Sequence, residues 1–121
     1  MNTPRLRADT ARLDLELLVE IAVESLSGKD RPAYLREYVW DYSVAEDECT
    51  LVFTLRTGRS AGLQLKTVIK GLGEDDALRL KVDSANEPGG LSLKYLAHLR
   101  KEMDNLEYNL RKVDGDVVVY R

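Results

Sequence analysis

The sequence predicts a single α+β domain, in which an antiparallel β-meander sheet of four to five strands packs against an N-terminal helix and a long C-terminal helix. Three features indicate this fold: regular apolar spacing over 91–113, alternating apolar residues over 38–83, and short polar links between the alternating segments. Short links join strands that are antiparallel neighbours. The expected order over residues 1–121 is therefore α-β-β-β-β-α-β, with residues 1–8 as a frayed terminus.

The long helix is expected at 91–113, where apolar residues recur three or four positions apart and so form one narrow stripe. The stripe consists of Leu96, Leu99, Met103, Leu106, Leu110 and Val113. Ser92 is a suitable N-cap, and Gly115 is placed to end the helix. A narrow stripe is more typical of helix pairing than of a helix on a sheet. We therefore expect the stripe to contact either the first helix or the same helix of a second subunit.

The first helix is predicted from a segment that fits two templates. Charged residues recur at every fourth position, as on one face of a helix; they are Arg12, Glu16, Glu20 and Glu24. Apolar residues also alternate from Leu13 to Val23, as in a half-buried strand. Because a strand of that length is uncommon, the sequence favours a helix that is capped by Asp9 or Thr10 and runs to Ser27, with Gly28 as its C′ residue.

The strands are predicted where apolar and polar residues alternate. These segments cover 38–44, 51–56, 63–70 and 78–83, and a short β-branched run at 117–120 adds a last strand. If the leucines of the third and fourth strands face the core, basic residues occupy the opposite face of the sheet. The basic residues are Arg56, Lys66, Lys70, Arg79 and Lys81.

This basic face has two interpretations. It could bind an acidic partner, either a phosphate backbone or a carboxylate-rich protein surface. Alternatively, the lysines and arginines only solvate the sheet and discourage edge pairing. The second interpretation is favoured, because proteins that bind single-stranded nucleic acids combine basic residues with aromatic side chains. Here the aromatic residues gather in the first predicted strand, around Trp40, where they fit a core better.

Composition excludes several kinds of chemistry. The 121 residues carry a formal net charge of −3, which argues against a dedicated DNA-binding protein. Cys49 and His98 are the only residues of their types, so an internal disulfide is impossible and most zinc sites are excluded. No catalytic residues, cofactor or metal site are predicted. The sequence has no apolar run of about 20 residues and no secretory signal, so we expect a cytoplasmic protein without membrane contact.

A metal-dependent nuclease is another alternative. The order of elements, Asp41, and the Gln64 and Lys66 pair on one strand suggest such a site, in which carboxylates hold Mg²⁺ and a lysine assists the attacking water. However, position 64 is Gln, which is a much poorer ligand than a carboxylate for a hard cation.

The sequence therefore favours a non-enzymatic protein–protein interaction module of the adaptor, chaperone, inhibitor or immunity type. We expect a homodimer that forms through the helix at 91–113. The alternatives are a nucleic-acid-binding protein that uses the basic sheet face, or a degenerate nuclease-like domain.

Overall fold

A computed structural model of the chain describes residues 4–26, 38–45, 48–55, 64–73, 76–86 and 93–121, with only the backbone given at 38–42, 44–45, 55, 85–86, 93–96 and 98. The elements follow in the order β1 (Leu6–Thr10), α1 (Leu15–Leu26), β2 (Tyr38–Ala45), β3 (Glu48–Leu55), β4 (Gln64–Gly71), β5 (Leu78–Asn86), α2 (Leu93–Val113) and β6 (Val118–Tyr120). The α+β class is confirmed.

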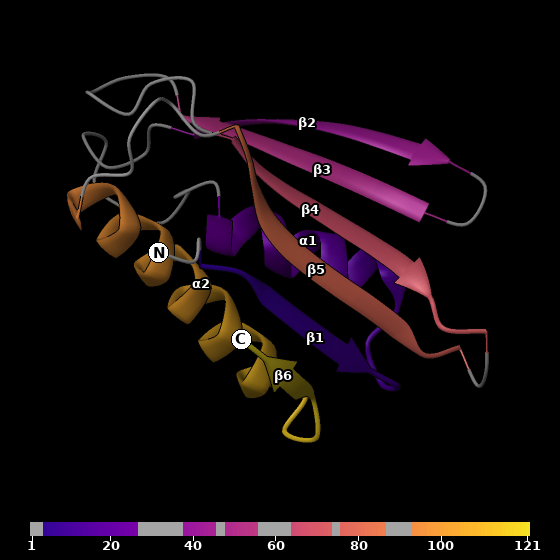
Figure 1. The fold of residues 1–121 in the computed structure, drawn as a ribbon. Coiled ribbons are helices and arrows are strands. Elements are labelled where there is room, and N and C mark those ends of the chain that lie inside the picture. The colour runs from indigo at the N-terminus through magenta and orange to yellow at the C-terminus, as the bar shows by residue number, and fades with distance from the viewer. Residues whose placement is uncertain (1–3, 27–37, 46–47, 56–63, 74–75, 87–92) are drawn as a thin grey trace.

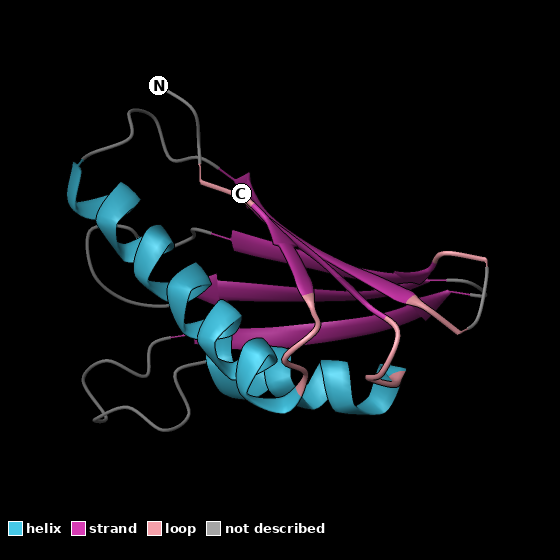
Figure 2. Ribbon diagram, turned by 90° about the horizontal axis from the view of Figure 1, so that it is seen from below, coloured by secondary structure: helices cyan, strands magenta, loops and turns pink. Residues whose placement is uncertain are grey.

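The strands form one six-stranded antiparallel sheet in the order β2-β3-β4-β5-β1-β6. Strands β2 to β5 are the predicted meander. Helices α1 and α2 lie on the same face of the sheet, and no helix of the described residues lies on the other face (Figures 1 and 2).

Residues 6–10 correct the expected start of the chain, because they form β1 instead of a frayed end or the first turn of a helix. Strand β1 pairs with β5 from Leu6 opposite Val82 to Thr10 opposite Leu78, and it also pairs with β6. Alternate residues of β1 are buried. The two flanking strands supply its backbone hydrogen bonds, so the segment is fixed by partners about 70 and 110 residues later in the chain.

Helix α1 confirms the choice of helix over strand, but it begins later than expected. Its N-cap is Asp14, whose carboxylate accepts a hydrogen bond from the backbone N–H of Leu17 at 2.8 Å. The buried residues of α1 recur three or four positions apart, as on one face of a helix. They are Leu18, Ile21, Ala22, Ser25 and Leu26.

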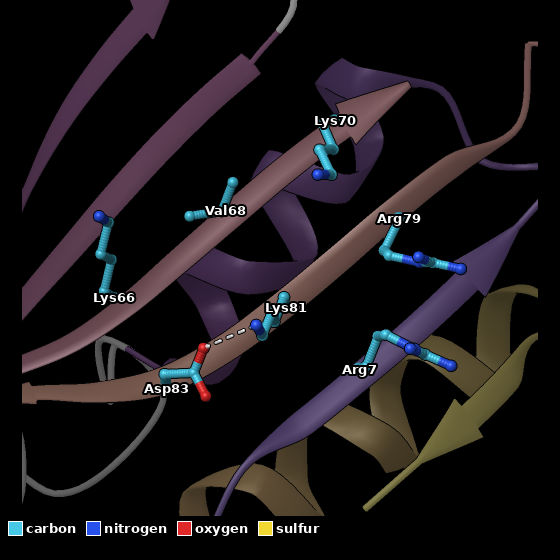
Figure 3. Close-up of a pocket in the computed structure, with 7 residues that line it drawn as sticks. All are labelled: Arg7, Lys66, Val68, Lys70, Arg79, Lys81 and Asp83. Carbon is cyan, nitrogen blue, oxygen red and sulfur yellow. Dashed lines mark ion pairs between the residues drawn. The ribbon is translucent and has the colours of Figure 1, made fainter. Parts of the chain in front are cut away.

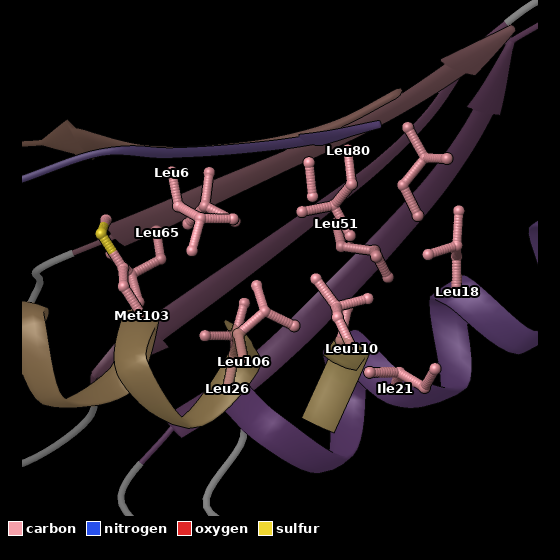
Figure 4. Close-up of a cluster of buried hydrophobic side chains, with 14 of the residues drawn as sticks. Leu6, Leu18, Ile21, Leu26, Leu51, Leu65, Leu80, Met103, Leu106 and Leu110 are labelled. Atoms are coloured by element: carbon pink, nitrogen blue, oxygen red, sulfur yellow. The ribbon is translucent and has the colours of Figure 1, made fainter. Parts of the chain in front are cut away.

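The core lies between the sheet and the two helices (Figure 4). Leu18 and Leu26 of α1 and Leu106 of α2 are fully buried together with side chains from the strands. The two helices are also joined by polar contacts. The amide nitrogen of Asn105 donates to the backbone oxygen of Ser25 at 3.0 Å, and that of Asn109 donates to the Ser25 hydroxyl at 2.8 Å.

A second buried polar contact connects the end of β1 to the end of α2. The Thr10 hydroxyl donates to the Asp114 carboxylate at 2.7 Å and accepts from the backbone N–H of Leu13 at 3.2 Å. The other oxygen of Asp114 accepts from the backbone N–H of Asp116 at 3.0 Å. This contact holds the turn that leads from α2 into β6, and thereby places β6 beside β1.

Candidate functional site

The candidate site lies on the face of the sheet opposite α1 and α2. In β4 and β5 the buried residues alternate with outward ones, so the side chains between them point away from the core. Figure 3 shows these outward side chains. They line a hollow of about 370 Å³. We call this surface the basic face. Its lining residues are Arg7, Lys66, Val68, Lys70, Arg79, Lys81 and Asp83.

Strand register places cations directly beside one another on this face. Lys70 is opposite Arg79 across β4 and β5, and Lys81 is opposite Arg7 across β5 and β1. Like charges at directly opposite positions destabilise a sheet. Five of the seven lining residues are cationic, in a chain whose formal net charge is −3. The positive charge is therefore concentrated here at some cost in stability.

One cation of the basic face, Arg79, is neutralised by a carboxylate of the same chain. Arg79 forms a two-point contact with Asp9, with Nε–Oδ1 at 2.7 Å and a terminal nitrogen–Oδ2 distance of 3.0 Å. The hydrogen bonds from Arg79 lower the pKa of the Asp9 carboxyl below its ordinary value of 3.8. The same bonds raise the pKa of Arg79. This pair fixes the β1 edge of the hollow.

The three lysines carry most of the available charge. Lys66 and Lys70 are exposed and make no ion pair within the described part of the chain. Lys81 pairs with Asp83 on its own strand at 3.7 Å, but both side chains are well exposed to water. Exposed pairs of this kind are weak and are screened by salt. All three ammonium groups are thus accessible to an anionic partner.

Arg7 is held differently, by an aromatic ring. Its guanidinium carbon lies 4.1 Å from the centre of the Tyr120 ring, which is a cation–π contact. Its Nε is buried and has no hydrogen-bond partner. Tyr120 lies opposite Arg7 in the register of β6 and β1, and 46% of the residue is exposed. Tyr120 therefore places an accessible aromatic residue at the edge of the basic face.

The structure brings together four of the five basic residues predicted for this face: Lys66, Lys70, Arg79 and Lys81. The fifth, Arg56, lies outside the described residues. Sequence reasoning missed Arg7, Asp9 and Tyr120, because it did not assign residues 6–10 to the sheet. The available signal was alternation in that segment, where Leu6, Ala8 and Thr10 are all buried.

Four residues of the apolar stripe of α2 are part of the core of their own chain. Leu99, Met103, Leu106 and Leu110 are each 0% exposed in the single chain, which fits the first of the two expected contacts, the one within the same molecule. Val113, at the end of the stripe, is 52% exposed. For Leu96 only the backbone is described.

A metal-dependent nuclease would need several ligand side chains close together. Among the described residues, no three His, Cys, Asp or Glu side chains lie close enough to hold one metal ion. Opposite Lys66 in the sheet lies Asp83, whose carboxylate pairs with Lys81. The side chain of Asp41 lies outside the description.

Comparison of the sequence with models of known protein families and with curated proteins finds no match. In the described part of the chain, no helix is both long enough and apolar enough to cross a membrane.

Proposed function

We propose that this chain is a non-enzymatic interaction module, and that the basic face is its binding surface for an acidic segment of a protein partner. The observation that carries the proposal is the concentration of Arg7, Lys66, Lys70 and Lys81 around one hollow, with like charges in direct register. An acidic partner would relieve the repulsion between these cations.

The charge distribution favours a protein over a nucleic acid. The whole chain has a formal net charge of −3, and exposed carboxylates such as Glu16 and Glu20 lie on α1, away from the basic face. A long polyanion that extends beyond the hollow would meet this unfavourable field. A short acidic segment of a folded or flexible protein would meet only the basic face.

The proposal is tested with fluorescently labelled poly-L-glutamate in an anisotropy titration at several salt concentrations. We expect binding at low salt that weakens as salt rises. The triple variant Lys66→Glu, Lys70→Glu and Lys81→Glu should lose this binding. The matched control reverses three exposed cations of α2 instead and should bind as the wild type does. It carries Arg100→Glu, Lys101→Glu and Lys112→Glu. Equal binding by the two triple variants would contradict the proposal.

Single-stranded nucleic acid is a second candidate partner, favoured by the exposed ring of Tyr120 beside Arg7. Stacking of a base on an aromatic side chain contributes about 1–3 kcal/mol. If the partner is a nucleic acid, a labelled oligothymidylate should bind more tightly than poly-L-glutamate. The Tyr120→Ala change should then weaken the binding of oligothymidylate and leave the binding of poly-L-glutamate unchanged. If Tyr120→Ala leaves oligothymidylate binding unchanged, this second candidate fails.

A further inference from the structure

Helix α1 presents a regular stripe of carboxylates to solvent. Glu16, Glu20 and Glu24 are all exposed, and none makes an ion pair within the part of the chain that the structure describes. Residues four positions apart in a helix are about 6 Å apart along the axis, so the three carboxylates span about 12 Å.

The basic face contains a row of three ammonium groups with nearly the same spacing. Lys66 and Lys70 lie four residues apart on β4, and Lys81 of β5 is opposite Val68, midway between them. With a rise of about 3.4 Å per residue, Lys66 and Lys70 are about 14 Å apart along β4. Lys81 lies about 7 Å along the sheet from each of them, displaced by one strand spacing of about 4.8 Å. The carboxylate stripe and the lysine row therefore match in charge, number and spacing.

The two surfaces cannot meet within one molecule. Helix α1 lies on one face of the sheet (Figures 1 and 2), and the lysine row projects from the opposite face (Figure 3). We infer that the acidic partner of the basic face includes a second copy of this chain, which docks the Glu16, Glu20 and Glu24 stripe of its α1 on the lysine row. This inference rests on the proposed function of the basic face and names one occupant of it.

Such a contact joins two different surfaces, so it is head-to-tail. Each bound molecule still presents its own basic face, and a head-to-tail contact that does not close into a ring produces growing chains of molecules. The contact consists of exposed charges, which interact weakly and are screened by salt. Self-association should therefore increase with protein concentration at low salt, without one fixed oligomer, and disappear at high salt.

Charge reversal tests the inference in analytical ultracentrifugation at low salt. The lysine-row variant carries Lys66→Glu, Lys70→Glu and Lys81→Glu, and the helix-stripe variant carries Glu16→Lys, Glu20→Lys and Glu24→Lys. Each variant alone should remain monomeric at concentrations where the wild type associates. The variant with all six changes keeps the wild-type net charge and restores opposite charges, so it should associate again. If a triple variant does not fold, as judged by circular dichroism, Lys70→Glu and Glu20→Lys replace the triple changes, singly and together.

Two results would overturn the inference: a wild-type chain that stays monomeric at low salt and high concentration, or a folded six-fold variant that fails to associate when the wild type does. These failures are distinguishable from failure of the proposed function. A monomeric wild type that still binds poly-L-glutamate through the lysine row would leave the proposed function standing and remove only the second copy as a partner.

Discussion

Replacement of Leu106 by Ala tests whether the apolar stripe of α2 is core or interface. Leu106 is 0% exposed in the single chain. The change removes three carbon atoms from a buried site, which costs about 2.4 kcal/mol of transfer free energy. The residual cavity adds to this cost, so we expect a total loss of about 3–4 kcal/mol in the free energy of unfolding.

This loss is large enough to measure by thermal and urea denaturation followed by circular dichroism. A domain of 121 residues has an unfolding entropy of about 0.25 kcal/mol/K, so the melting temperature should fall by about 12–16 °C. The control is Val113→Ala at the exposed end of the same stripe, which should change stability by less than about 0.5 kcal/mol. The core assignment would be refuted if Leu106→Ala melted like the wild type while its sedimentation showed the loss of a dimer.

Three further predictions concern single polar groups. Thr10→Val should lower the free energy of unfolding by about 1–3 kcal/mol in urea denaturation, because it leaves the buried Asp114 carboxylate without its hydroxyl donor; no change would show that water replaces the hydroxyl. The hydrogen bonds from Arg79 lower the pKa of Asp9 in the folded protein below 3.8. The wild type should therefore have a higher free energy of unfolding than Asp9→Asn above pH 3.8, and this difference should shrink as pH falls through the lowered pKa. An advantage that persisted unchanged in acid would contradict this. Burial raises the pKa of the Cys49 thiol, so iodoacetamide should label it slowly in the native protein and rapidly in denaturant; fast native labelling would mean that β3 opens readily.

The sequence predicted those elements whose patterns are local. The apolar period over several turns predicts a helix at 91–113, and α2 runs over Leu93–Val113. The meander of β2 to β5 was recognisable from alternation and short links. Strand β1 was not, because its five residues are held by pairing with β5 and β6. Such distant pairing leaves little trace in the local sequence.

The width of the α2 stripe understates the surface that this helix buries. The apolar stripe is narrow, but the buried surface of α2 is broader, because polar residues flank the stripe inside the protein. Glu102 is fully buried, and Asn105 and Asn109 bond to Ser25 of α1. A count of apolar residues alone therefore underestimates the face that α2 buries in its own chain. This broader face explains why α2 packs within one molecule.

Only the part of the candidate site on β4 and β5 could be predicted from the sequence. Alternation in β4 and β5 was enough to place Lys66, Lys70, Arg79 and Lys81 on one face. The pairing of Arg79 with Asp9, and the packing of Arg7 on Tyr120, depend on β1 lying between β5 and β6. The cations could thus be predicted as a group, whereas the residues that neutralise or orient them required the topology.

Backbone chemical-shift mapping is the most direct test of the basic face as the binding surface. Poly-L-glutamate would be titrated into the ¹⁵N-labelled chain at low salt. The proposed function predicts that the largest amide shifts occur in β1, β4 and β5, around Arg7, Lys66, Lys70 and Lys81, and that salt reverses them. Shifts confined to α2, or no shifts at concentrations that bind poly-L-glutamate, would contradict it.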